Sequence, residues 1–175
     1  DTLNVREGPG TDFPVIAELA PSATGIEVTG LDPATGWGRI NVEERVGWVS
    51  MAFLAAAPVA TVGGVPWPLS CYGTEPFWGL DLATDGSATF DRFGERVASL
   101  DRVEPARSAN LLGRSGLVAR TPVADLSAIL ATRDCSDGMS DRLYGYAIDM
   151  ILDVGEGPEV LSGCCSLSAD CGAQR

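Results

Sequence analysis

Residues 37–50 are "WGRINVEERVGWVS", and this stretch predicts a β-hairpin. In each half, one face collects large or polar side chains while the other collects glycine and aliphatic residues, the period of a half-buried strand. The charged letters "EER" between the halves fit a tight turn. Upstream, "VREGPGTDFPVIAEL" at residues 5–19 adds a Gly-Pro-Gly loop followed by an apolar run. About fifty residues with five short strands of this kind predict a small β-barrel.

The C-terminal part is predicted to be rich in strands as well. Residues 144–152, "YGYAIDMIL", alternate large apolar side chains with smaller ones. Further strands are expected at "FWGLDLA", "GSATFDRF" and "SGLVAR", and the Asp-Gly pair of "TDGS" at residues 84–87 indicates a hairpin turn. Residues 122–133, "PVADLSAILATR", fit either a helix or a strand, and both remain open.

A segment without charge or periodicity separates the two parts. Residues 55–70, "AAAPVATVGGVPWPLS", are rich in proline and glycine, which indicates a linker. We therefore expect a barrel at residues 1–54, a linker at 55–70, and a second β-rich domain at 71–175, either a barrel or a sandwich.

The cysteines bear on the compartment and on the second domain. All five follow the linker, at Cys71, Cys135, Cys164, Cys165 and Cys171. They predict two disulfides with one cysteine left over, and hence a periplasmic or secreted protein. Neighbouring cysteines pair only with strain, so a bond from Cys135 to Cys164 or Cys165 is favoured. Cys171 is either free or paired with Cys71.

Charge and composition exclude several classes of function. Twelve basic and 24 acidic residues give a net charge of −12, so nucleic acid is not an expected partner. The chain has no His, and every basic residue is Arg. Ser-His-Asp and Cys-His catalysis, His-bearing zinc sites and Schiff-base chemistry are thereby excluded. We expect no metal and no cofactor, and no apolar run approaches the ~18 residues of a membrane span. The first residues lack the features of a signal peptide, so we expect any such peptide to have been removed or to lie outside this sequence.

The first part of the chain carries a family resemblance. The segments "LNVREGPGTDFPVIAEL", "GIEVTG", "GWGRINV" and "VGWVSMAFL" closely resemble the bacterial SH3 (SH3b) domain. The resemblance implies a small barrel that binds cell-wall peptide or docks to a protein. We expect Trp37, Trp48 and Phe13 to supply core side chains, and any ring left exposed to form a shallow peptide groove near Asn4 and Arg6.

The second part, about residues 69–167, is similar to a family of uncharacterised bacterial envelope proteins. The shared motifs are "GTEPFW" at 73–78, "CSDGMSD" at 135–141 with Tyr144 shortly after, and "LSGCC" at 161–165. Family members usually carry proline after that tyrosine, where this chain has Gly145. No activity is assigned to this family, so the resemblance supports a prediction of fold and compartment more than one of function.

The "CSDGMSD" segment could be a metal-binding loop or a turn held by a disulfide. Its acidic residues do not follow the spacing of an EF-hand calcium loop, which argues against metal binding. A turn at Asp137-Gly138, tied down by Cys135, is favoured. Because rigid polar loops often recognise ligands, Asp137, Ser140 and Asp141 are candidate binding residues.

The "GTEPFW" segment also has two interpretations. Glu75 beside Phe77 and Trp78 would place a carboxylate next to an aromatic platform, which suits sugar binding. In the alternative, Trp78 fills the core and Glu75 caps the backbone or pairs with an arginine.

These observations predict a non-enzymatic protein of the bacterial cell envelope. Its SH3-like domain would dock to peptidoglycan or to an envelope protein, and its second domain would bind a further ligand. The alternatives are a carboxylate-based hydrolase of cell-wall glycan and a periplasmic lysozyme inhibitor. The sequence predicts no oligomeric state.

Overall fold

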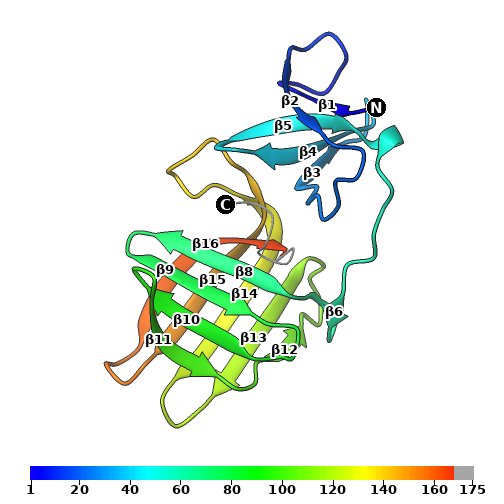
Figure 1. Cartoon of the computed structure of the whole chain (residues 1–175). Helices are drawn as coiled ribbons and strands as arrows, with labels where there is room; N and C mark the ends of the chain where they lie inside the picture. The colour runs from blue at the N-terminus through cyan, green and yellow to red at the C-terminus, as the bar shows by residue number, and fades with distance from the viewer. Residues whose placement is uncertain (168–175) are drawn as a thin grey trace.

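The structure, a computed structural model, describes residues 1–167 and is almost entirely β. Two sheets enclose two separate cores, and a short two-stranded hairpin lies between them along the chain (Figure 1). The prediction of a mainly β fold with disulfides in its C-terminal part is confirmed. Within the described residues, no helix has the length and apolar character needed to cross a membrane.

The first sheet has five strands in the order β2-β1-β5-β4-β3. Their bounds are β1 (Leu3–Arg6), β2 (Val15–Leu19), β3 (Gly30–Asp32), β4 (Trp37–Val42) and β5 (Arg45–Ser50), and a 3-10 turn η1 (Met51–Phe53) follows. The hairpin predicted at residues 37–50 is β4 and β5, paired from Trp37–Ser50 to Val42–Arg45. Its turn consists of Glu43 and Glu44 alone, since Arg45 already belongs to β5.

The core of the first barrel is aliphatic, and the expectation that its large aromatic residues help to build it is wrong. The core centres on Val5, Ile40 and Val49. Trp37 and Trp48 are half-buried outside this cluster, and Phe13 is 44% exposed. The inner face has no room for a ring: even a methyl group on the inward-facing Gly47 would lie 2.4 Å from Val5 Cγ1.

The segment expected to be a linker is shorter in the structure. After an irregular stretch, residues 61–66 form the small hairpin of β6 (Thr61–Val62) and β7 (Val65–Pro66). Val65, Trp67 and Leu69 are buried in the second core, and the Trp67 indole donates a hydrogen bond to the Ala83 carbonyl. The second domain therefore begins before Cys71.

The second sheet has nine antiparallel strands and curls around one large core (Figure 1). Two meanders meet where the first and last of these strands pair, giving the order β11-β10-β9-β8-β16-β15-β14-β13-β12. The strands are β8 (Leu69–Thr74), β9 (Phe77–Leu82), β10 (Ala88–Arg92), β11 (Glu95–Leu100), β12 (Glu104–Arg107), β13 (Arg114–Arg120), β14 (Asp125–Cys135), β15 (Tyr144–Asp153) and β16 (Glu159–Leu167).

The ambiguous stretch at residues 122–133 lies mostly in strand β14. Leu126, Ala128 and Leu130 are buried there, whereas Asp125 before them and Ile129 between the last two are exposed, which is the period of a strand.

Two disulfides join the strands of this sheet. Cys71 on β8 is bonded to Cys165 on β16, and both belong to the core cluster. Cys135, at the end of β14, is bonded to Cys164. Because Cys71 is engaged in this way, it is not the partner of Cys171, which lies outside the described residues.

Candidate functional site at the junction of the two barrels

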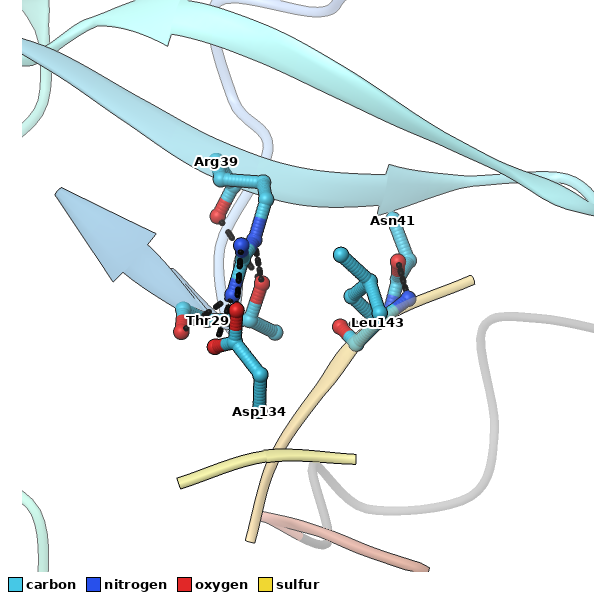
Figure 2. Close-up of polar contacts among 5 residues, drawn as sticks. All are labelled: Thr29, Arg39, Asn41, Asp134 and Leu143. Atoms are coloured by element: carbon cyan, nitrogen blue, oxygen red, sulfur yellow. Dashed lines mark hydrogen bonds and ion pairs between the residues drawn. The ribbon is translucent and has the colours of Figure 1, made fainter. Parts of the chain in front are cut away.

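The first barrel and the curled nine-stranded sheet, an open half-barrel that is called the second barrel below, are joined by a polar junction that centres on Arg39 (Figure 2). From the outward face of β4, its Nη1 and Nη2 donate to the two carboxylate oxygens of Asp134, at 2.9 and 2.5 Å. Its Nε donates to Thr29 Oγ1 at 3.1 Å, which fixes the guanidinium in place. The Arg39 side chain is only 12% exposed, and hydrogen bonding from it lowers the pKa of Asp134. A paired, nearly buried guanidinium of this kind orients one domain against the other.

In a second contact, a side-chain amide takes the place of the backbone partner that a neighbouring strand would supply. Asn41, two residues along the same face of β4, donates from Nδ2 to the Leu143 carbonyl at 3.0 Å. It also accepts from the Leu143 N–H at 3.1 Å (Figure 2). The amide thus satisfies both backbone groups of Leu143, immediately before β15 begins.

The tip of the β4–β5 hairpin is held by the segment between β14 and β15, which extends toward it (Figure 1). The Asp141 N–H donates to the Glu44 carbonyl at 3.0 Å, and the Arg142 guanidinium donates to the Glu43 carbonyl. Glu43 has φ of +53°, which is uncommon for a residue with a side chain. Arg142 therefore binds the backbone carbonyl of the residue that has the unusual φ angle.

Within the "CSDGMSD" segment, the Asp137 carboxylate organises the turn. It accepts hydrogen bonds from the N–H groups of Met139 and Ser140, each at 3.0 Å, and from the Ser140 hydroxyl. The Tyr144 hydroxyl donates to it at 3.4 Å. Burial alone would raise the pKa of Asp137, but these hydrogen bonds together outweigh burial, so the pKa lies below its ordinary value. The carboxylate is therefore ionised and committed to the loop.

The two motifs of the second domain meet through Thr74. Its hydroxyl donates to the Asp137 carbonyl at 3.1 Å, so the "GTEPFW" hairpin lies against the "CSDGMSD" loop. Glu75 is exposed in the turn between β8 and β9 and forms no ion pair with any described residue. Trp78 is 4% exposed in the core, and it is Phe77 that faces outward.

A carboxyl group also lies at the domain boundary. Glu27 accepts a hydrogen bond at Oε1 from the Leu167 N–H, at 3.2 Å. Burial raises the pKa of Glu27 to about 7, and the hydrogen bond only partly offsets this. On β15, burial and the charge of Glu27 raise the pKa of Tyr146.

The candidates on the first barrel lie on the outward face of its sheet. Arg6 on β1 pairs in register with Trp48 on β5, which in turn pairs with Arg39 on β4. These three residues form one row, and the Arg39 end of the row is engaged with the second barrel. Asn4, earlier on β1, and Trp37, at the start of β4, lie outside this row.

The sequence did not point to Arg39, Asn41, Asp134 or Arg142. Alternation in "WGRINV" places Arg39 and Asn41 on the outer face, but no local pattern names partners 95 and 102 residues away.

Two hollows adjoin the loop on the second barrel and share residues 72–74. The larger has a volume of about 540 Å³ and is lined by Tyr72, Gly73, Thr74, Phe77, Trp78, Gly79, Asp91, Phe93 and Gly94. The smaller, of about 210 Å³, lies beside the Cys135–Cys164 disulfide and residues 135–137.

Comparison with known proteins identifies the first barrel. Residues 1–55 match the family described as the bacterial SH3 domain, and the first barrel is such a domain. Searches of curated proteins and of solved structures returned no match. The resemblance of residues 69–167 to a family of envelope proteins remains a prediction.

Proposed function

We propose that this protein is a non-enzymatic binding protein of the bacterial cell envelope. Its SH3 domain attaches to peptidoglycan or to an envelope protein, and its second barrel binds a further ligand. The observation that carries the proposal is the match of residues 1–55 to the bacterial SH3 domain. The two disulfides of the second barrel support a location in an oxidising compartment.

The junction supports joint action by the two domains. Arg39, Asn41 and the β4–β5 tip all bond to residues 134–143, so the SH3 domain and the second barrel are held in a defined orientation. A ligand on the second barrel would then be presented at a fixed position relative to whatever the SH3 domain binds.

The geometry favours binding over glycan hydrolysis. Glycosidases use two carboxyl groups that flank the scissile bond. Asp137, whose backbone carbonyl accepts from Thr74 of the "GTEPFW" hairpin, has its carboxylate occupied by the hydrogen bonds of its own turn. No contact within residues 1–167 favours a lysozyme inhibitor in particular.

Co-sedimentation with purified peptidoglycan tests the attachment. The intact protein should pellet with the wall material, and Trp48→Ala should reduce the pelleted fraction because it removes the ring at the centre of the outward row. Phe53→Ala is the matched control, since Phe53 is a 75% exposed ring on η1 and is not part of that row. Thermal unfolding of each variant checks that the fold is retained.

Three outcomes are informative. Loss of pelleting with Trp48→Ala alone supports wall attachment through this face. Equal pelleting of all three proteins would move the attachment to another surface. If the intact protein stays in solution, wall attachment is wrong and a protein partner is left as the target of the SH3 domain.

A further inference from the structure

Two exposed phenylalanines meet on the outer surface of the second barrel. Phe77 on β9 is 47% exposed, and Phe93 in the β10–β11 turn is 74% exposed. Their ring centroids lie 6.3 Å apart in an edge-to-face arrangement. Phe77 alternates with the buried Trp78, so a polar side chain would be ordinary at its position. The folded state keeps both rings in contact with water.

The turn that carries Phe93 is an unfavourable place for a phenylalanine. Arg92 and Glu95 pair across the hairpin, which leaves Phe93 and Gly94 as a two-residue loop with φ of +51° and +78°. A loop with both φ values positive prefers Asn-Gly, because residues with a bulky side chain adopt positive φ at a cost in free energy. Phe93 thus bears both backbone strain and exposure, a combination found where a residue serves a function.

The hollow of about 540 Å³ lies beside this aromatic pair, and the only charge in its lining is that of Asp91. The Asp91 carboxylate lies over Gly79, where a methyl group would be 2.4 Å from Oδ2. Among the described residues no arginine pairs with it. Arg92 is bonded to Glu159, and Arg96, opposite Asp91 in register, forms no ion pair with it.

We propose that this hollow binds an arginine side chain of a basic segment of a protein partner. The guanidinium would pair with the Asp91 carboxylate, and its flat face and apolar stem would pack on Phe77 and Phe93. The inference rests on the proposed role of the second barrel as a ligand-binding domain, and it names the ligand class for that domain.

Charge and shape select this occupant. A guanidinium stacks on aromatic faces and pairs with carboxylates in a planar fork, so it uses both features of the hollow. A lining with one carboxylate and no cation does not match an anionic ligand, and the net charge of −12 attracts basic partners. A sugar would need several polar partners, whereas the polar side chains on the outward positions of the lining are those of Tyr72, Thr74 and Asp91. Thr74 already donates to Asp137, and the Tyr72 ring packs edge-on against Tyr144.

The test is calorimetric titration of the intact protein with a pair of peptides at low ionic strength. One is acetyl-Gly-Leu-Arg-Leu-Gly-amide, and the other carries citrulline, the neutral isostere of arginine, in place of Arg. The arginine peptide should bind, and the citrulline peptide should bind about tenfold more weakly or not at all. Backbone amide shifts should change at residues 77–79, 91, 93 and 94, which line the hollow.

Three variants locate the interaction. Asp91→Asn should weaken binding of the arginine peptide about tenfold. Phe93→Asn should weaken it about fivefold while leaving the midpoint of thermal unfolding unchanged or higher, because Asn-Gly suits the turn better. Asp101→Asn changes net charge equally but lies beyond the far end of β11, and it should leave the affinity within about twofold.

The outcomes separate this inference from the proposed function. Equal binding of both peptides, or full affinity in Asp91→Asn and Phe93→Asn, would overturn the arginine site while the second barrel remained a binding domain. No binding of the arginine peptide would likewise overturn it. The SH3 attachment is judged separately, by co-sedimentation.

Discussion

Replacing Glu27 by Gln should remove a pH dependence of stability that the natural protein shows between about pH 4.5 and 7. Burial at the domain boundary raises the pKa of Glu27 from 4.5 to about 7. The folded protein therefore holds this proton more tightly than the unfolded chain does. The stability that protonated Glu27 contributes is fully present below the unfolded pKa of 4.5 and is lost as the pH rises through the folded pKa of about 7.

The magnitude follows from the size of the shift. Two and a half pKa units correspond to about 3.4 kcal/mol at full burial. Because the Glu27 side chain is only partly buried in the sheet junction, solvent screening reduces this to roughly 2 kcal/mol. Glu27→Gln keeps an oxygen that can accept from the Leu167 N–H but carries no charge at any pH. The variant should match the natural protein near pH 4 and exceed its stability by roughly 2 kcal/mol near pH 8.

Urea unfolding at about pH 4.5, 6 and 8, followed by tryptophan fluorescence, measures the difference. Glu18→Gln on β2 is the control, because Glu18 is exposed and its variant should parallel the natural protein. If the Glu27→Gln and natural profiles run parallel from about pH 4.5 to 8, the carboxyl is not held in a desolvated junction. The account of the domain boundary would then be refuted.

Three further predictions concern stability. Arg39→Lys keeps the charge but loses the two-pronged bond to Asp134, and it should lower the free energy of unfolding by about 1 kcal/mol, measured by urea unfolding. The double change Cys135→Ser and Cys164→Ser opens a loop of 29 residues and should cost about 3 to 4 kcal/mol, whereas an unchanged denaturation midpoint would argue against this bond. Leu126→Ala empties a fully buried position of the second core and should cost about 2 to 5 kcal/mol, measured by thermal unfolding.

Local patterns predicted the strands well where both faces had distinct chemistry. The hairpin at residues 37–50 has the predicted strands because glycine and aliphatic residues line one face of each strand. Residues 122–133 were ambiguous because Ile129 falls at helical spacing from Leu126. In the strand Ile129 is 47% exposed, and the small Ala128 takes the buried place.

The errors came from quantities that a single sequence does not display. The large side chains of Trp37 and Trp48 suggested that they build the first core. The inward positions next to them are glycines with no space for a larger side chain, and the two rings lie on the outward face. The junction was not predicted because Arg39 and Asp134 become neighbours only when both barrels have formed. Such contacts depend on tertiary packing and not on local periodicity.

The polar residues that first suggested a ligand site now have structural partners. Asp137 and Ser140 bond to each other within their turn, and the backbone of Asp141 bonds to the SH3 hairpin. Buried or turn-forming polar groups need such partners, so their presence is accounted for without a ligand. Phe77 and Phe93 lack an account of this kind, since exposed rings gain little from folding, and the Asp91 carboxylate beside them has no ion-pair partner within residues 1–167. Features that folding does not explain are the better guide to binding, and here they lie on the outer face of β9 and β10 and not in the loop.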